Sequence, residues 1–127
     1  MTTAASSSSA IVDSFIAAVC RKDLDGALAL LADDVEYDNV PMRKVFGRSG
    51  VSDTLGPFVA GCSAIDWVVH HQVAEGDVVM NERLDRFEMG GRWVEVAVAG
   101  LFVLRDGLIV LWRDYFDLAS FTASMGG

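Results

Sequence analysis

The amino-acid sequence predicts an α+β fold in which a curved, mixed but mostly antiparallel sheet wraps around N-terminal helices to form a conical pocket. Apolar residues recur at helical spacing in the first half of the chain, and β-rich runs separated by turn signals fill the second half. Helices followed by an antiparallel meander are typical of α+β rather than βαβ proteins. A length of 127 residues suits one domain, so we expect residues 1–127 to form a single unit with residues 1–9 as a flexible tail.

Two helices are expected at the start of the chain. Residues 11–19 place apolar side chains at helical spacing, directly after a serine run at residues 6–9. Any of these serines can cap the helix, because a serine oxygen can accept a hydrogen bond from a free backbone N–H of the first turn. Asp23 can cap a second, short helix whose apolar positions extend to Leu31.

One strand and one further helix are expected next. Residues 35–40 alternate and end at Pro41, which favours a strand. Residues 49–60 follow a helical pattern with apolar side chains on one side. Pro57 lies inside this pattern and implies a kink or an early end, because proline has no backbone N–H to donate.

The rest of the chain is predicted to form strands joined by tight turns. The strands are expected over residues 64–74, 78–89, 92–105 and 108–116. The turn signals between them are Glu75-Gly76-Asp77, Gly90-Gly91 and Asp106-Gly107. A short C-terminal helix is expected after Asp117, which can cap it, with Phe121 on its apolar side.

Composition excludes several classes of protein. The chain has 10 basic and 18 acidic residues, and this net charge of −8 argues against a nucleic-acid partner. No apolar run approaches the ~20 residues that a membrane helix needs, so no membrane partner is expected. Cys20 and Cys62 lie far apart without a CxxC motif, which argues against a disulfide framework or a zinc site. Residues 1–9 lack the basic and apolar segments of a signal peptide, so we expect a cytoplasmic protein.

The informative pattern is a set of polar side chains on strand faces that are otherwise apolar. Residues two apart on a strand share a face, so Tyr37 and Asn39 point the same way, as do Arg83 and Asp85. Asp114 lies between two aromatic residues of its own face and would be costly to bury unless paired. Arg83 is the natural partner. If these strands line one cavity, two carboxylates, a guanidinium, a phenol and an amide meet there.

This set of residues leaves two interpretations open. One is acid–base catalysis on a neutral substrate, in which one carboxylate accepts a proton and the other donates one. The other is a buried ion pair with no catalytic role, because structural networks of charges also occur in proteins. Strand alternation alone does not favour either.

At these positions the sequence resembles the limonene-1,2-epoxide hydrolase family, which lies within the NTF2-like and ketosteroid-isomerase-like α+β superfamily. The resemblance extends from about residue 11 to residue 121. The Glu-Arg-x-Asp and Trp-Arg-Asp-Tyr-Phe-Asp segments are specific when they occur together. The matching stretches are Tyr37-Asp38-Asn39-Val40-Pro41, Gly47-Arg48, Glu82-Arg83-Leu84-Asp85 and Trp112-Arg113-Asp114-Tyr115-Phe116-Asp117-Leu118.

The resemblance implies the one-step hydrolysis of a small apolar cyclic or terpenoid epoxide to a vicinal diol. Asp114 would be the general base and would deprotonate a water molecule that Tyr37 and Asn39 also hold. Asp85 would be the general acid and would protonate the epoxide oxygen, and Arg83 would bridge the two carboxylates. Family members use no metal and no organic cofactor, so none is expected here.

The resemblance also implies an apolar binding pocket and a homodimer. A second copy agrees with the strand at residues 92–105, which is apolar on both faces. Leu55 and Trp67 are further candidates for the pocket wall. Resemblance and alternation together assign the substrate-binding wall to Phe58, Phe87, Val96, Val98, Trp112, Phe116 and Phe121.

Two other functions fit the same fold. One is an isomerase or polyketide cyclase that removes a proton next to a carbonyl group, although a guanidinium joining two carboxylates is not typical of that chemistry. The other is a non-catalytic module for ligand binding or dimerisation, which would not need the polar set. Turnover of a cyclic epoxide separates the first interpretation from both of these.

Overall fold

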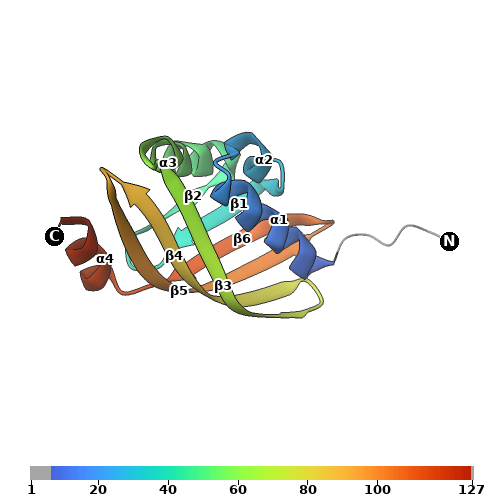
Figure 1. Ribbon diagram of the computed structural model, residues 1–127. Coiled ribbons are helices and arrows are strands. Elements are labelled where there is room, and N and C mark those ends of the chain that lie inside the picture. Colours follow the sequence, from blue (N-terminus) through green and yellow to red (C-terminus); the bar gives the residue numbers. More distant parts are fainter. Residues whose placement is uncertain (1–6, 127) are drawn as a thin grey trace.

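The computed structural model describes residues 7–126, which form six strands and four helices (Figure 1). The strands lie in one sheet in the order β2-β1-β6-β5-β4-β3. Only β1 and β6 pair in parallel within the described residues, so the predicted mixed, mostly antiparallel sheet is confirmed. The elements are α1 (Ser8–Cys20), α2 (Leu24–Leu28), β1 (Leu31–Asn39), β2 (Arg43–Phe46), α3 (Gly47–Gly61), β3 (Ala64–Glu75), β4 (Val78–Met89), β5 (Arg92–Arg105), β6 (Leu108–Tyr115) and α4 (Leu118–Gly126).

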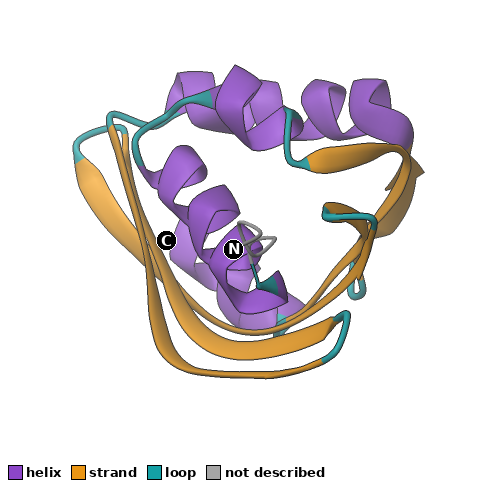
Figure 2. Ribbon diagram, turned by 90° about the vertical axis from the view of Figure 1, so that its right-hand side faces the viewer, coloured by secondary structure: helices purple, strands orange, loops and turns teal. Residues whose placement is uncertain are grey.

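The sheet curves around α1, and α2 and α3 lie across its open side (Figure 2). The inner face of the sheet and the apolar side of α1 form the core. Phe15 of α1 packs edge-on against Trp112 and Phe102, with ring centroids 4.9 and 6.2 Å away. Full burial of a side chain of this size stabilises the fold by roughly 1.5–3 kcal/mol relative to exposure. Because α1 fills one end of the curved sheet, the other end is left for a pocket.

The predicted helix caps are confirmed. Ser7 caps α1 by accepting a hydrogen bond from Ala10 N (3.1 Å), and Asp23 caps α2 by accepting one from Gly26 N (3.0 Å). Asp117 accepts a hydrogen bond from Ser120 N (3.0 Å) at the start of α4. Since α1 begins at Ser8, the expected tail of residues 1–9 overlaps the first turn of this helix, and residues 1–6 lie outside the described part of the chain.

The structure differs from the expected elements in three places. The helix α3 continues past Pro57 to Gly61, so the early end is wrong, because Val59 is still packed against the core beyond the proline. Leu31 begins β1 rather than ending α2, since it pairs with Ile109 of β6. The strand β2 was not expected, because its four residues are mostly exposed and show no alternation of burial.

Two strands contain a one-residue register shift that alternation along the sequence does not predict. In β6, Val103 is opposite Leu111 and Leu104 is opposite Ile109, so one residue is unpaired between them. As a consequence, the buried side chain is that of Ile109, and neither Leu108 nor Val110 shares the face of Trp112 as expected. The second shift, in β3, lies between Val69 and His71.

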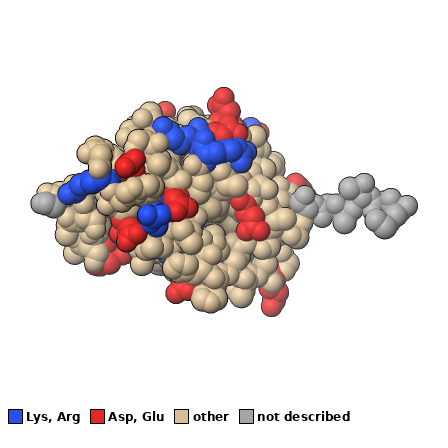
Figure 3. Space-filling model, in the orientation of Figure 1, with Lys and Arg blue, Asp and Glu red and all other residues tan. Residues whose placement is uncertain are grey.

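The surface carries charges of both signs. On the face shown in Figure 3, the basic side chains that are visible lie close to acidic ones. Arg86, for example, forms ion pairs with Asp66 and Glu95. Exposed pairs of this kind contribute little to stability, typically below about 1 kcal/mol each. Within residues 7–126, no helix is both long and apolar enough to cross a membrane.

Candidate active site

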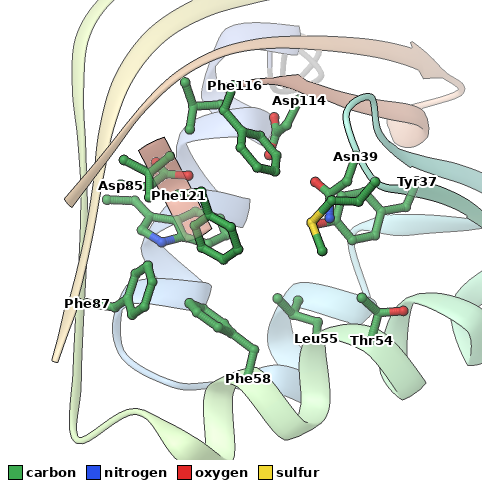
Figure 4. Close-up of a pocket in the computed structure, with 14 residues that line it drawn as sticks. Tyr37, Asn39, Thr54, Leu55, Phe58, Asp85, Phe87, Asp114, Phe116 and Phe121 are labelled. Carbon is green, nitrogen blue, oxygen red and sulfur yellow. The ribbon is translucent and has the colours of Figure 1, made fainter. Parts of the chain in front are cut away.

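A pocket of about 180 Å³ opens between the inner face of the sheet, α3 and α4 (Figure 4). Five polar side chains line it, and four of them belong to the predicted catalytic set. Tyr37 and Asn39 come from β1, Asp85 comes from β4, Asp114 comes from β6, and the unexpected fifth, Thr54, comes from α3. The structure therefore brings three strands together around one cavity.

Arg83 lies behind the two carboxylates and joins them. Its Nε and Nη2 atoms donate to Asp85 Oδ1 (2.9 Å) and Asp85 Oδ2 (3.0 Å), and Nη2 also donates to Asp114 Oδ2 (3.0 Å). The Arg83 side chain is fully buried, as the ion pairs with both carboxylates require. The bidentate contact to Asp85 is the strong and directional geometry that a guanidinium forms with a carboxylate.

A glycine allows Arg83 to reach Asp114 across an intervening strand. Gly100 of β5 pairs with Asn81 of β4 on one side and with Asp114 of β6 on the other. A Cβ on Gly100 would overlap Arg83 Nη1 and would lie only 2.8 Å from Asn81 Oδ1 and 3.1 Å from Asp114 Oδ1. Sequence reasoning missed Gly100, although a glycine inside a strand is itself a signal of a close approach.

Burial shifts the pKa values of both carboxyl groups in the same direction. It raises the pKa of Asp85 and of Asp114 above the ordinary value, and the contacts with Arg83 oppose this effect. The negative charge of Asp114 raises the pKa of Asp85 further. Burial acts to lower the pKa of Arg83, but the two carboxylates outweigh it and keep the guanidinium charged. One guanidinium facing two buried carboxyl groups favours the retention of one proton by the pair.

One oxygen of Asp114 is not bound by Arg83. Asp114 Oδ1 is buried and, like the Trp112 indole nitrogen, forms no hydrogen bond of normal geometry among residues 7–126, although a contact with Trp112 lowers the pKa of Asp114. Asn39 lies opposite Asp114 in the parallel pairing of β1 with β6. Tyr37, two residues before Asn39, stacks on Trp112 with ring centroids 3.8 Å apart, and burial raises the pKa of its phenol, so the phenol stays protonated. A carboxylate oxygen beside a phenol and an amide can accept a proton from a bound water molecule.

The pocket walls are apolar and largely aromatic. Phe58 and Phe87 form one edge-on pair with centroids 4.9 Å apart, and Phe116 and Phe121 form another at 5.6 Å. In Figure 4, Phe58 and Phe87 lie across the cavity from Tyr37 and Asn39. The structure places the following sequence-predicted wall residues on the pocket: Leu55, Phe58, Trp67, Phe87, Val96, Val98, Phe116 and Phe121.

Trp112 is a correction to the predicted wall. It is fully buried, and Tyr37 covers it on the pocket side, so it supports the site from behind instead of lining it. Sequence reasoning also missed two lining residues, Met42 and Thr54. Thr54 lies four residues before Phe58 on α3, so helical spacing could have identified it. Met42 lies in the turn after β1, where no periodic pattern applies.

The described part of the chain contains no group of three or more His, Cys, Asp or Glu side chains arranged to hold a metal ion. The charged groups of the pocket instead contact one another through Arg83. Their arrangement suits proton transfer to and from a neutral molecule held against the apolar walls.

Comparison with known proteins gives consistent results. Residues 6–125 match the family model described as the limonene-1,2-epoxide hydrolase catalytic domain. The chain is 36% identical to Epoxide hydrolase EphG of Mycobacterium tuberculosis over 107 residues, which are 84% of this chain and 71% of that protein.

Two solved structures extend the comparison. The LEH-like epoxide hydrolase of M. tuberculosis superposes with a TM-score of 0.82 at 32% identity, covering 92% of this chain and 87% of that one. A putative SnoaL-like polyketide cyclase from Shewanella putrefaciens superposes with a TM-score of 0.83 at 14% identity, covering 94% and 96% of the two chains. The second likeness shows a shared fold alone.

Proposed function

The chain belongs to the limonene-1,2-epoxide hydrolase family, and we propose that it hydrolyses a small apolar cyclic or terpenoid epoxide to a vicinal diol by one-step attack of water. Family membership supports epoxide hydrolysis in general, while the substrate and the mechanism are our proposal. The observation that carries the proposal is the contact of one buried guanidinium with two carboxylates on the wall of an apolar pocket.

In this mechanism Asp114 is the general base. Its free Oδ1 oxygen accepts a proton from a water molecule that Tyr37 and Asn39 also hold. The oxygen of that water molecule then forms a bond to one ring carbon, and the bond between this carbon and the epoxide oxygen breaks. Arg83 favours the ionised form of Asp114, which the base must have at the start of each turnover.

Asp85 is the general acid and gives its proton to the epoxide oxygen as the ring opens. Burial, and to a smaller extent the negative charge of Asp114, raise the pKa of Asp85, which favours the protonated form that a general acid must have. Each turnover moves one proton from Asp85 to the epoxide oxygen and one from the attacking water molecule to Asp114. The proton must then return from Asp114 to Asp85 before the next cycle.

The chemistry matches the difficulty of the reaction. Ring strain drives epoxide opening, but water is a poor nucleophile and an alkoxide is a poor leaving group near neutral pH. A positioned base and a positioned acid address these two barriers, and each typically contributes about 10²–10⁴-fold to the rate. The proposed proton transfers use side chains alone, without a metal or an organic cofactor.

The aromatic walls favour the carbon skeleton of the substrate over polar competitors. Phe87 and Val96 lie next to Asp85, which would face the epoxide oxygen, and Phe58 packs edge-on against Phe87 on the same side of the cavity. A cyclic or terpenoid skeleton would bury apolar surface against these side chains, at about 25 cal/mol for each Å² removed from water.

We also propose that a second copy of the chain covers the outer face of the sheet. Met80 and Tyr115 are exposed there at 49% and 47%, and they pair across strands with Leu101 and Ala99. These apolar side chains lie on three neighbouring strands, β4, β5 and β6, and exposed apolar residues gathered on one face are typical of a protein interface. The molecular mass in solution tests this part of the proposal: the mass of two chains is expected, and the mass of one chain would contradict it.

Two measurements test the proposed reaction. Purified protein is expected to convert a small cyclic epoxide to a diol, whereas an absence of turnover across a panel of cyclic and terpenoid epoxides would reject the function. A single turnover in ¹⁸O-water with enzyme in excess tests the mechanism. Direct attack by water places the label in the first diol molecule formed. An unlabelled diol together with a labelled carboxylate would show that an aspartate is the nucleophile.

A further inference from the structure

We infer that Asn81 and Gln72 are positioning residues, which form an oriented hydrogen-bond chain from α1 to the Arg83 guanidinium and hold Arg83 in place between the two carboxylates. The catalytic meaning of this inference rests on the proposed function. The chain itself is a feature of the structure and can be tested without turnover.

The chain consists of three consecutive contacts between side chains. Gln72 Nε2 donates to Asp13 Oδ1 (3.0 Å) and to Ser9 Oγ (2.6 Å) of α1. Asn81 Nδ2 donates to Gln72 Oε1 (3.1 Å). Arg83 Nη1 then donates to Asn81 Oδ1 (2.9 Å), on the side of the guanidinium away from Asp85. Asn81 and Arg83 are both buried, so an alternative partner from solvent is not at hand for either.

The two ends of the chain determine the orientation of both amides. A guanidinium can only donate hydrogen bonds, so Asn81 must present its oxygen to Arg83. Its NH₂ group then faces Gln72, which must present an oxygen in turn. The NH₂ group of Gln72 is thereby directed to Asp13, whose carboxylate can only accept. A flip of either amide would place two donors or two acceptors against each other.

A register shift in β3 makes the chain possible. Val69 is opposite Arg83, whereas Gln72 is opposite Asn81, so β3 has one extra residue between these two pairs. Without this bulge, alternation would turn the Gln72 side chain to the outer face of the sheet. Bulges are often found beside functional sites, where they redirect a side chain. Here the bulge directs Gln72 toward Asn81 and α1.

Asn81 differs from the other partners of Arg83 in one respect that matters for catalysis. Among residues 7–126, the guanidinium donates to Asp85, Asp114 and Asn81. In the proposed reaction both carboxyl groups change protonation, so their hold on Arg83 changes during each cycle. Asn81 remains neutral throughout. It therefore gives Arg83 a fixed anchor. The absence of a side chain on Gly100 leaves the space that the guanidinium occupies.

Few other titratable groups face the carboxyl pair. Tyr37 of β1 and the Cys20 thiol of α1 lie nearby, and burial raises the pKa of both, which keeps them neutral. The pocket lining contributed by α3, β5 and α4 contains no titratable side chain. A change in the titration of the pair would therefore report on Arg83 and its anchor.

The test compares Asn81→Leu and Gln72→Leu with the wild-type protein. Loss of the anchor loosens the contact of Arg83 with Asp114, so the apparent pKa of the carboxyl pair is expected to rise. The carboxyl ¹³C signals of Asp85 and Asp114, followed by NMR during a pH titration, measure this without any substrate. With an epoxide substrate, kcat is expected to fall by roughly 10- to 100-fold in Asn81→Leu, as for loss of one hydrogen bond to a charged group, with little change in KM. Gln72→Leu should show the same changes at smaller size.

Two further variants serve as rescue and control. The double variant Asp13→Asn with Gln72→Glu moves the carboxylate one step along the chain but keeps an oxygen facing Asn81, so most of the kcat that Gln72→Leu loses is expected to return. Val79→Ala, on the same strand and buried in the core, should lower the melting temperature without moving the titration.

The outcomes separate the inference from the proposed function. If Asn81→Leu and Gln72→Leu lower only the melting temperature, as Val79→Ala does, the chain is merely structural and the inference is wrong. If the carboxyl titration shifts as expected while the wild-type protein opens no epoxide, the positioning role stands and the proposed function fails.

Discussion

The guanidinium of Arg83 occupies the space that a side chain on Gly100 would fill. Arg83 is on β4 and Asp114 is on β6, so their ion pair must cross β5, and it does so at the one residue of that strand without a Cβ. The contact that joins the two carboxyl groups therefore depends on Gly100, a residue without a side chain.

Gly100→Ala should displace Arg83 from Asp114 and remove most of the activity. The new methyl group would overlap Nη1 of a guanidinium that Asp85, Asn81 and Asp114 already hold in place. Epoxide turnover and the carboxyl titration of Asp114 measure the effect. Gly56→Ala is the matched control, because its Cβ would only reach ordinary contact with Leu24 and its helical position favours alanine. Wild-type turnover in Gly100→Ala would show that activity does not depend on the contact of Arg83 with Asp114 across β5.

Asp114→Asn and Asp85→Asn should each reduce kcat by about 10²–10⁴-fold, since each removes one half of the proposed acid–base pair. Both amides are close in size to the carboxyl groups that they replace, so the variants should remain folded. Steady-state turnover and circular dichroism give the two readouts. A folded variant with a kcat near the wild-type value would show that the residue in question does not have its assigned role.

Exchange of Phe87, Val96 or Val98 for a smaller or larger apolar residue should change selectivity among epoxides more than it changes stability. All three line the pocket. One methylene group in such a wall is worth about 1–3 kcal/mol, which is enough to reverse a modest preference. Competition between two epoxides of different ring size measures the effect as a ratio of diols. Unchanged ratios in all three sets of variants would mean that the substrate binds elsewhere.

The pH dependence of stability should report the buried carboxyl pair. Folding raises the pKa of Asp85 and Asp114, so in the interval above the unfolded value of about 4 the folded state binds more protons than the unfolded state. The contribution of the pair to the free energy of unfolding is therefore fully present below about pH 4 and is lost as the pH rises through the folded pKa values.

Asp85→Asn should flatten this dependence, because it removes one of the two coupled groups and the charge that acts on the other. Urea unfolding at a series of pH values between 4 and 8 measures the free energy for both proteins. The wild-type protein should lose more stability over this range than the variant. Parallel curves would show that Asp85 titrates alike in the folded and unfolded states.

Several features of the fold and of the site could be predicted from the sequence because they depend on local geometry. Alternation along β4 placed Arg83 and Asp85 on one face, and the structure confirms that both are buried on the inner side. Serine and aspartate at helix starts identified the caps, since capping needs only a side-chain oxygen next to the first turn. These relationships involve residues within a few positions of each other, where bond geometry leaves few alternatives.

Other features were decided by contacts between residues far apart in the chain. Resemblance and alternation together assigned Trp112 to the pocket wall, but neither shows that Tyr37, 75 positions earlier in the chain, stacks on it and covers it. The bulge that turns Gln72 toward Asn81 arises from the pairing of β3 with β4, and a shift of one residue reverses every face that follows it. The crossing of Arg83 above Gly100 likewise required the order of β4, β5 and β6 in the sheet. Strand order and register depend on the total packing of the core, and for this reason only the tertiary structure shows which polar side chains share one cavity.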